Sequence, residues 1–299
     1  MKTVVALGSL REDITFKYDF SRPLNVPEVK VNNAEWSVGG SVHNTCLYLS
    51  LKSSDVNVHM CSSNYILLVQ RVNQYATVGN YRIITTTNEL KKHPVSIIGV
   101  CEDGDKHILS YDPIVDKELL LIFEREVEKA DFVYTSLYEI NDENYRNLCE
   151  IFQKCHSRGV TTMIDLCPLV SSFNVNVLRE VLKKIVIVSG NEYEFKELMH
   201  KLCVDDMNEL LLNFSNVQHL FVKKGNRGAE YKTRRETKKY EFCCCEQDRA
   251  NILNTTGCGD VFNAVIIEGF CLGDNSKSIL QSAVIESGRI AKRGLPWIK

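Results

Sequence analysis

Short apolar runs alternate with longer amphipathic stretches through most of the chain. The first run, at 3–9, ends in Gly-Ser as a buried strand does, and similar runs recur with helix-like stretches between them. This alternation predicts a mainly parallel sheet covered by helices on both faces. The expected strands lie at 3–9, 56–62, 131–137, 160–166, 185–190 and 219–225, and the expected helices at 39–52, 66–76, 118–130, 142–159, 176–184, 191–202, 259–270 and 276–292.

Two β-rich regions, at about 14–38 and 81–112, do not fit this alternation. The second contains Glu-Asp-Gly-Asp at 102–105, which is typical of a hairpin turn. Together the two regions predict a small separate sheet that forms a flap over the main one. A further hairpin is expected at 229–246. Because no internal repeat or low-complexity linker divides the sequence, we interpret residues 1–299 as a single domain.

Composition indicates which partners the protein binds and in which compartment it is located. The chain has 299 residues, of which 44% are hydrophobic, and a formal net charge of −2, so nothing favours a polyanionic partner. The basic cluster at 232–239 is interpreted as a solvated loop or edge strand rather than a nucleic-acid contact. No apolar segment reaches the roughly 18 residues of a membrane span, and the N-terminus lacks the features of a signal peptide. We therefore expect a cytoplasmic protein that binds neither nucleic acid nor membrane.

Twelve cysteines are scattered along the chain without a Cys-x-x-Cys pair. The one run, Cys243–Cys245, lacks the spacing of a zinc site. The cysteines are therefore expected to be reduced thiols, most of them packed as small hydrophobic side chains.

The stretch Asn-Thr-Thr-Gly-Cys-Gly-Asp at 254–260 carries the clearest candidate chemistry. Gly257 and Gly259 precede an apolar helix, and the N-terminus of a helix offers free N–H groups and a partial positive charge to an anion. Asp260 would repel a phosphate there, unless it has a task such as taking a proton from an incoming hydroxyl. The alternative is that Asp260 only caps the helix. Spacing alone does not decide between these two interpretations.

The same stretch resembles the C-terminal signature of the ribokinase-like (PfkB) carbohydrate and nucleoside kinases, Asp-Thr-x-Gly-Ala-Gly-Asp. The resemblance spans the chain, and further motifs follow the family's order. It implies a ribokinase-like three-layer α/β/α sandwich with a mainly parallel central sheet and a small β-sheet lid. The matching stretches are 7–14, the Gly-Gly motif at 39–44, the lid hairpin at 102–110, the Asn-x-x-Glu motif at 190–194 and the Gly-x-x-Gly loop at 223–228.

The resemblance also implies roles for individual residues. Asp260 would be the catalytic base, and the backbone of the three residues before it would form an anion hole for the γ-phosphoryl group. These three are Gly257, Cys258 and Gly259. The acceptor would lie against Asp13, Gly39, Gly40 and Asn44. ATP would lie against Asn191, Lys223, Gly225 and Gly228, and Glu194 would help to place Mg²⁺, through water.

Several residues depart from the family's pattern. Asn254 replaces the usual first aspartate of the signature, Cys258 replaces an alanine, and Lys223 stands where threonine is frequent. The backbone N–H of Cys258 can still serve the anion hole. Lys223 either contacts a phosphate or points into solvent.

The sequence thus predicts an ATP- and Mg²⁺-dependent phosphotransferase acting on a hydroxymethyl group of a small sugar. A nucleoside kinase of the same fold is the alternative, and a weakly active sugar- or nucleoside-binding sensor is a third reading. A nucleotide-binding oxidoreductase is disfavoured because no Gly-x-Gly-x-x-Gly follows the first strand. Exposed lid strands could pair two subunits into a homodimer. The resemblance leaves open whether a monovalent cation is needed.

Overall fold

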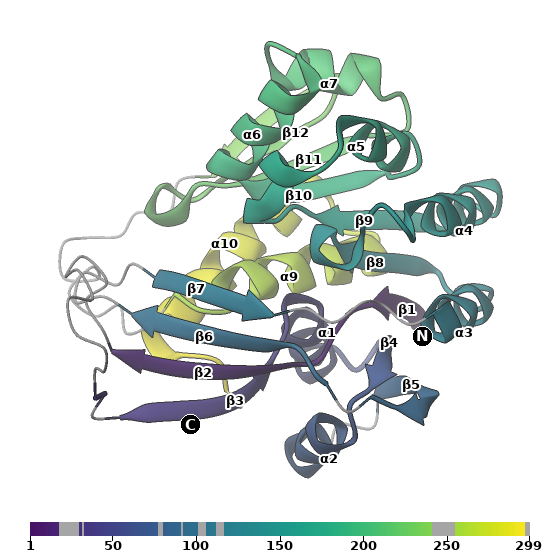
Figure 1. Ribbon diagram of the computed structural model, residues 1–299. Helices are drawn as coiled ribbons and strands as arrows, with labels where there is room; N and C mark the ends of the chain where they lie inside the picture. The colour runs from purple at the N-terminus through teal and green to yellow at the C-terminus, as the bar shows by residue number, and fades with distance from the viewer. Residues whose placement is uncertain are drawn as a thin grey trace.

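The computed structural model describes residues 1–17, 30–31, 33–76, 80–90, 92–100, 106–111, 117–240 and 255–296, and its strands form two sheets (Figure 1). The larger sheet has the order β13-β12-β11-β10-β9-β8-β1-β4-β5, and its neighbouring strands pair in parallel except at one edge, where β12 is antiparallel to both β11 and β13. The strands are β1 Lys2–Leu7, β4 Val56–Asn64, β5 Tyr81–Glu89, β8 Phe132–Ser136, β9 Thr161–Asp165, β10 Ile187–Asn191, β11 His219–Lys223, β12 Ala229–Lys232 and β13 Thr237–Tyr240.

Helices cover both faces of the larger sheet, which confirms the predicted three-layer arrangement (Figure 1). In β1, Val4 and Ala6 pack against the layer of α1, α9 and α10, whereas Val5 and Leu7 pack against α3 to α7. All four side chains are fully buried, because a parallel strand inside a sandwich faces helices on both sides. The helices are α1 Ser41–Lys52, α2 Ile66–Tyr75, α3 Lys117–Val127, α4 Tyr145–Ser157, α5 Val175–Leu182, α6 Glu192–Leu202, α7 Met207–Asn213, α9 Cys258–Leu272 and α10 Ser276–Arg293.

The smaller sheet has the order β3-β2-β6-β7 and lies in front of α1 and α9 in Figure 1. Its strands are β2 Arg11–Lys17, β3 Ala34–Gly39, β6 Val95–Val100 and β7 Lys106–Tyr111. The predicted separate sheet therefore exists, but its limits differ from those expected. Its first segment begins at Arg11, before residue 14. The second begins at Val95, because β5 at 81–89 pairs with β4 in the larger sheet. The predicted hairpin turn at 102–105 lies outside the described residues.

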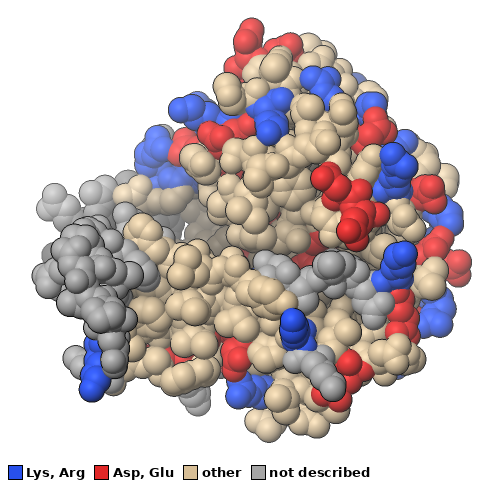
Figure 2. All heavy atoms as spheres, in the orientation of Figure 1, with Lys and Arg blue, Asp and Glu red and all other residues tan. Residues whose placement is uncertain are grey.

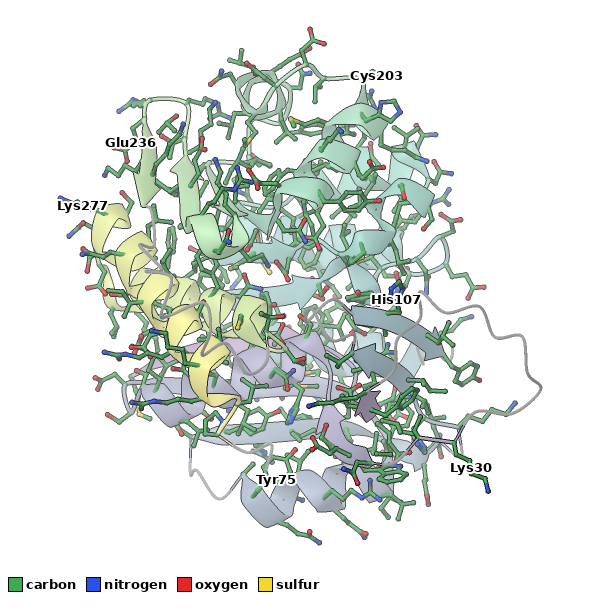
Figure 3. All side chains as sticks on the ribbon, turned by 90° about the vertical axis from the view of Figure 1, so that its left-hand side faces the viewer. Lys30, Tyr75, His107, Cys203, Glu236 and Lys277 are labelled. Atoms are coloured by element: carbon green, nitrogen blue, oxygen red, sulfur yellow. The ribbon has the colours of Figure 1, made fainter. Side chains whose placement is uncertain are left out.

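The basic cluster at 232–239 forms part of the hairpin of β12 and β13, so the prediction of an edge strand is confirmed. Figure 3 shows this hairpin beside the start of α10, with Glu236 and Lys277 labelled. Lys238 donates to the Ser276 hydroxyl at 2.9 Å, which ties the edge strand to α10. Arg234 donates to one carbonyl in the last turn of α7, that of Leu211, and to three carbonyls after its end, so this arginine caps the helix.

Within the described ranges, none of the helices combines the length and the apolarity that a membrane span needs. The eight cysteines in those ranges are all free thiols, as expected from their spacing. The run Cys243–Cys245 lies outside the described residues.

Candidate active site

The carboxyl ends of the central strands and the N-termini of α1 and α9 meet at one edge of the larger sheet. Asp165 ends β9, Asn191 ends β10 and Lys223 ends β11. The register pairs Asn191 with Lys223 and Ser189 with Asp165, so β10 and β11 end level with each other and β9 ends two residues earlier. In a parallel α/β sheet this edge is where ligands bind, against the N-termini of helices.

Asp260 lies in the first turn of α9 and is held by α1. The Ser41 hydroxyl donates to its Oδ1 at 2.8 Å, and the Asn44 amide donates to its Oδ2 at 2.9 Å. The N-cap of α9 is Gly257, no side-chain cap is recorded there, and both Asp260 oxygens accept from α1, so Asp260 does not cap its own helix. Burial raises the pKa of Asp260 to about 6, although the hydrogen bonds from Asn44 and Ser41 oppose that rise. The carboxylate is thus ionised and still basic near neutral pH.

Ser41 is a residue that sequence reasoning missed. It directly follows Gly39-Gly40 in the paired-glycine motif, and this position next to predicted acceptor residues was the available signal. Its hydroxyl reaches Asp260 because α1 packs along α9 at their N-terminal ends (Figure 1).

Asp13 and the paired glycines lie together, but not where the sequence suggested. Asp13 was expected directly after the first strand at the carboxyl edge; instead it lies inside β2 of the smaller sheet, because the chain turns at 8–10. A Cβ on Gly39 would lie 1.9 Å from Asp13 Oδ2, and one on Gly40 would lie 2.3 Å from the Ser9 carbonyl oxygen. Side chains at 39 and 40 would therefore displace the Asp13 carboxylate and the Ser9 backbone.

Burial also shapes the hydrogen-bonding capacity of these residues. It raises the pKa of Asp13 to about 6, against the lowering effects of a Ser96 hydrogen bond and of the Arg11 charge. Asn44 uses its amide N–H₂ on Asp260, while its buried Oδ1 has no partner among the described residues. A buried polar atom of this kind normally has a partner, so Asn44 Oδ1 is suited to accept from a ligand hydroxyl.

Glu139, which the sequence did not single out, fixes the loop after β1. Its two carboxylate oxygens accept from the Ser9 N–H at 3.0 Å and the Ser9 hydroxyl at 2.8 Å. Glu139 is buried just after β8, next to β1 in the larger sheet. A glutamate between a strand and a turn carries no distinctive pattern in the sequence, so spacing could not have found it.

The residues predicted to bind the nucleotide line a cavity of about 450 Å³. It has the size of a small-molecule site, and the described residues that line it all belong to the C-terminal half of the chain. The predicted residues that line it are Asn191, Glu194, Lys223, Gly225, Gly228, Cys258 and Gly259. The other residues that line it were not predicted individually, although most lie in the Gly225–Gly228 loop and the two C-terminal helices, over which ATP was expected to lie: Asn226, Thr255, Phe262, Val284, Ser287, Gly288, Ala291 and Lys292.

The Asn-x-x-Glu motif forms a capping box at the start of α6. Asn191 Oδ1 accepts from the Glu194 N–H at 2.8 Å, and Glu194 Oε2 accepts from the Asn191 N–H at 2.7 Å. Burial and the nearby Asp165 charge raise the pKa of Glu194 to about 7. The motif therefore has a structural task, and it also presents a buried carboxyl to the cavity.

The first turn of α9 supplies amide groups at the inner end of the cavity. The Cys258 N–H donates to the Thr255 carbonyl at 3.3 Å. The amides of Gly259 and Asp260 have no recorded acceptor within the described ranges, as expected for the first turn of a helix. The N–H of Cys258, which the sequence assigned to an anion, is thus engaged in this structure. Asn254 lies outside the described residues.

The donor set suits magnesium held mainly by water and phosphate. The described part of the chain contains no cluster of three carboxylate, histidine or cysteine side chains that could enclose a metal ion. Glu194, with Asn191 beside it, offers a single carboxylate at the cavity wall, and Mg²⁺ usually keeps several waters. These residues fit such an ion.

Sequence comparison identifies the family. Residues 1–285 match the profile described as pfkB family carbohydrate kinase. The chain belongs to the pfkB family. It is therefore an enzyme of the pfkB type: an ATP-dependent kinase whose acceptor is an alcohol group. A search of curated protein sequences finds no match.

Solved structures of similar fold include kinases for different acceptors. The pfkB chain is similar to a nucleoside kinase of Burkholderia thailandensis in complex with inosine, with TM-score 0.75, 17% identity, and 99% of this chain and 93% of that chain covered. It is also similar to the ribokinase of Thermotoga maritima, with TM-score 0.73, 20% identity, and 99% of this chain and 96% of that chain covered. A third similar structure is the adenosine kinase of Sinorhizobium meliloti, with TM-score 0.76, 18% identity, and 97% of this chain and 94% of that chain covered. The TM-scores establish the ribokinase-like fold, and at these low identities the acceptor is left open.

Proposed function

We propose that this enzyme transfers the γ-phosphoryl group of ATP to a hydroxymethyl group of a small sugar, with Asp260 as the base. The position of Asp260 is the observation that carries the proposal. Its carboxylate contacts Ser41 and Asn44 on the acceptor side, while Cys258 and Gly259, just before it, line the nucleotide cavity. One turn of α9 thus separates the two substrates.

In the proposed reaction the acceptor hydroxyl lies near Asp260, oriented by Asp13 and Asn44. Two carboxylate oxygens on Asp13 can accept from neighbouring hydroxyls of a sugar, and Asn44 Oδ1 can accept from another. Asp260 takes the hydroxyl proton as the oxygen attacks the γ-phosphorus in line. The bond to the β-phosphate oxygen breaks, and ADP leaves from the cavity.

The nucleotide would lie in the 450 Å³ cavity, its phosphates toward the first turn of α9. Gly225 and Gly228 line the cavity from the loop after β11, and Lys223, which also lines it, would lie beside the phosphates. When bound, Mg²⁺ would neutralise charge on the phosphate oxygens, with Glu194 and Asn191 placing it through water.

A nucleoside acceptor is the second candidate. One similar structure contains inosine and another is an adenosine kinase, so the fold accommodates nucleosides. The base and the phosphate site would serve both acceptor classes alike. A sensor that binds sugar or nucleoside without efficient transfer is the third candidate, and the buried, hydrogen-bonded Asp260 argues against it.

An acceptor panel tests this proposal. ATP consumption with sugars and with nucleosides separates the first two candidates, and ligand-induced thermal stabilisation without turnover would favour the sensor. Asp260→Asn is expected to lower kcat by about 100-fold or more while acceptor affinity is largely kept. Unchanged turnover in this variant would reject Asp260 as the base.

We further propose a homodimer that forms through the smaller sheet. The support is an apolar row across its four strands, formed by Trp36, Ile14, Ile97 and Leu109, which are paired in register. In Figure 2, the area where this sheet lies carries few charged side chains.

A cytoplasmic location is proposed as well, because free thiols fit a reducing compartment.

A further inference from the structure

A buried ion pair lies between the nucleotide cavity and the base. Lys223 Nζ is 2.7 Å from Asp165 Oδ1, and both side chains are largely buried. The register pairs Asp165 with Ser189 and Lys223 with Asn191, which puts both charged side chains on one face of the sheet with β10 between them. That face is the one covered by α9, because Ser189 donates to Asn263 of α9.

The Lys223 ammonium lies directly under the first turn of α9. A Cβ on Gly259 would lie 3.5 Å from Lys223 Nζ, and both residues line the cavity. A cation beside the N-terminus of a helix is unfavourable, because the helix dipole is positive there. Asp165 offsets part of that repulsion in the free protein. Two positive groups side by side, the ammonium and the helix N-terminus, form a site that an incoming anion would stabilise.

The lysine keeps hydrogen-bonding capacity for such an anion. An ammonium group has three N–H donors, and the one hydrogen bond that the described residues record for Lys223 goes to Asp165. Two donors are therefore available to an acceptor in the cavity that Lys223 lines. Phosphate oxygens are strong acceptors for an ammonium group.

We propose that Lys223 binds the terminal phosphoryl group of the nucleotide and that Asp165 is the positioning residue that holds its ammonium there. This inference rests on the proposed function, and it adds a specific consequence. Because the lysine supplies positive charge without a metal ion, the chain should bind ATP more tightly than AMP even when divalent cations are removed. AMP lacks the β- and γ-phosphates that would reach Lys223.

The experiment compares paired charge-neutral variants of the full chain. Lys223→Met alone would leave Asp165 buried without its partner, which can unfold the protein, so it is combined with Asp165→Asn. The matched control is Lys224→Met with Glu230→Gln. Lys224 is the neighbouring lysine, it forms an ion pair with the buried Glu230, and it is not among the residues that line the cavity. Kd values for ATP and AMP are measured by calorimetry in EDTA.

The expected result is a loss of ATP affinity of about 10-fold or more in the Lys223/Asp165 double variant, with AMP affinity unchanged and the control double variant like wild type. If the double variant binds ATP as well as wild type, Lys223 only neutralises Asp165 and the inference is wrong. Equal losses for ATP and AMP would also overturn it, because the pair would then shape the whole cavity. So would wild-type protein that binds ATP no better than AMP.

The inference and the proposed function can fail separately. Turnover of a sugar with ATP and Mg²⁺, together with an unaffected double variant in EDTA, would keep the kinase proposal and reject the role of Lys223. Wild-type protein that binds neither nucleotide, with or without Mg²⁺, would reject both.

Discussion

Two neutral donors tune the proposed base. Ser41 and Asn44 both donate to Asp260, and each stabilises its ionised form, so they limit the rise in pKa that burial causes to a value of about 6. Since a base acts only when deprotonated, activity should fall as the pH drops through this value. Asp13, with a pKa also near 6, would lose its ionised form over the same pH range and weaken acceptor binding.

Ser41→Ala tests this tuning. Loss of the hydroxyl donor raises the pKa of Asp260, so the acid limb of kcat against pH should move up by about one pH unit, while activity well above pH 7 changes little. The measurement is kcat from pH 5 to 9 at saturating acceptor. Ser50→Ala is the matched control, because Ser50 is on the same helix and donates to the carbonyl of Leu47 instead. An acid limb that stays in place would argue that Asp260 does not titrate in the reaction.

At the residue scale, the sequence predicted site residues that stand at a motif's spacing, but not residues whose partners are brought near only by the fold. Asp260 and Asn44 stand at recognisable spacings, and they do meet at 2.9 Å. Glu139 could not be found, because its partner Ser9 is far away in sequence and only the pairing of β8 with β1 brings them together. Nor could sequence show that Lys223 is paired, since its partner Asp165 lies two strands away.

A glycine stands at each end of α9, and comparing the two distinguishes a role in stability from a role in catalysis. Gly257, at its N-cap, has φ of 79°, and Gly273, at its C-cap, has φ of 78°. An alanine at either position is strained in this left-handed conformation by roughly 1–2 kcal/mol. At 257 its Cβ would also lie 2.5 Å from the Leu295 side chain, whereas at 273 it would meet open space.

We therefore expect both Gly257→Ala and Gly273→Ala to lower the free energy of unfolding by at least about 1 kcal/mol. Only Gly257→Ala should also lower kcat/KM for ATP, by about 10-fold, because it displaces the turn that carries the amides of Gly259 and Asp260. Urea unfolding and steady-state kinetics on both variants provide the comparison. Equal kinetics in the two variants would contradict an anion site at the N-terminus of α9.

At the element scale, patterns predicted which segments form elements better than where each one packs. The last two helices, expected at 259–270 and 276–292, are α9 Cys258–Leu272 and α10 Ser276–Arg293. The strand at 81–89 was predicted too, but assigned to the wrong sheet. It is an edge strand of the larger sheet, and its half-exposed pattern resembles that of a lid strand. Alternation reports which residues are exposed and not which strand is the neighbour.

At the scale of the whole molecule, the smaller sheet leaves an apolar row uncovered among the described residues. On the outer face of the smaller sheet, Trp36 is 60% exposed and Leu109 is 65% exposed, and register places Ile14 and Ile97 in the row between them. Monomeric proteins seldom expose a continuous apolar row of this kind. A second copy of the chain would present an identical row, and two sheets can bury such rows face to face in a twofold dimer.

Leu109→Glu should disrupt that dimer without unfolding the chain, because the side chain is exposed in the single subunit. Leu212→Glu is the control: Leu212 is 72% exposed on α7, which is not part of the smaller sheet. Sedimentation at micromolar concentration should show dimers for wild type and the Leu212 variant, and monomers for the Leu109 variant. Because the smaller sheet carries Asp13, loss of its partner should raise KM for the acceptor more than KM for ATP. Wild-type protein that sediments as a monomer would mean that the exposed row serves another purpose.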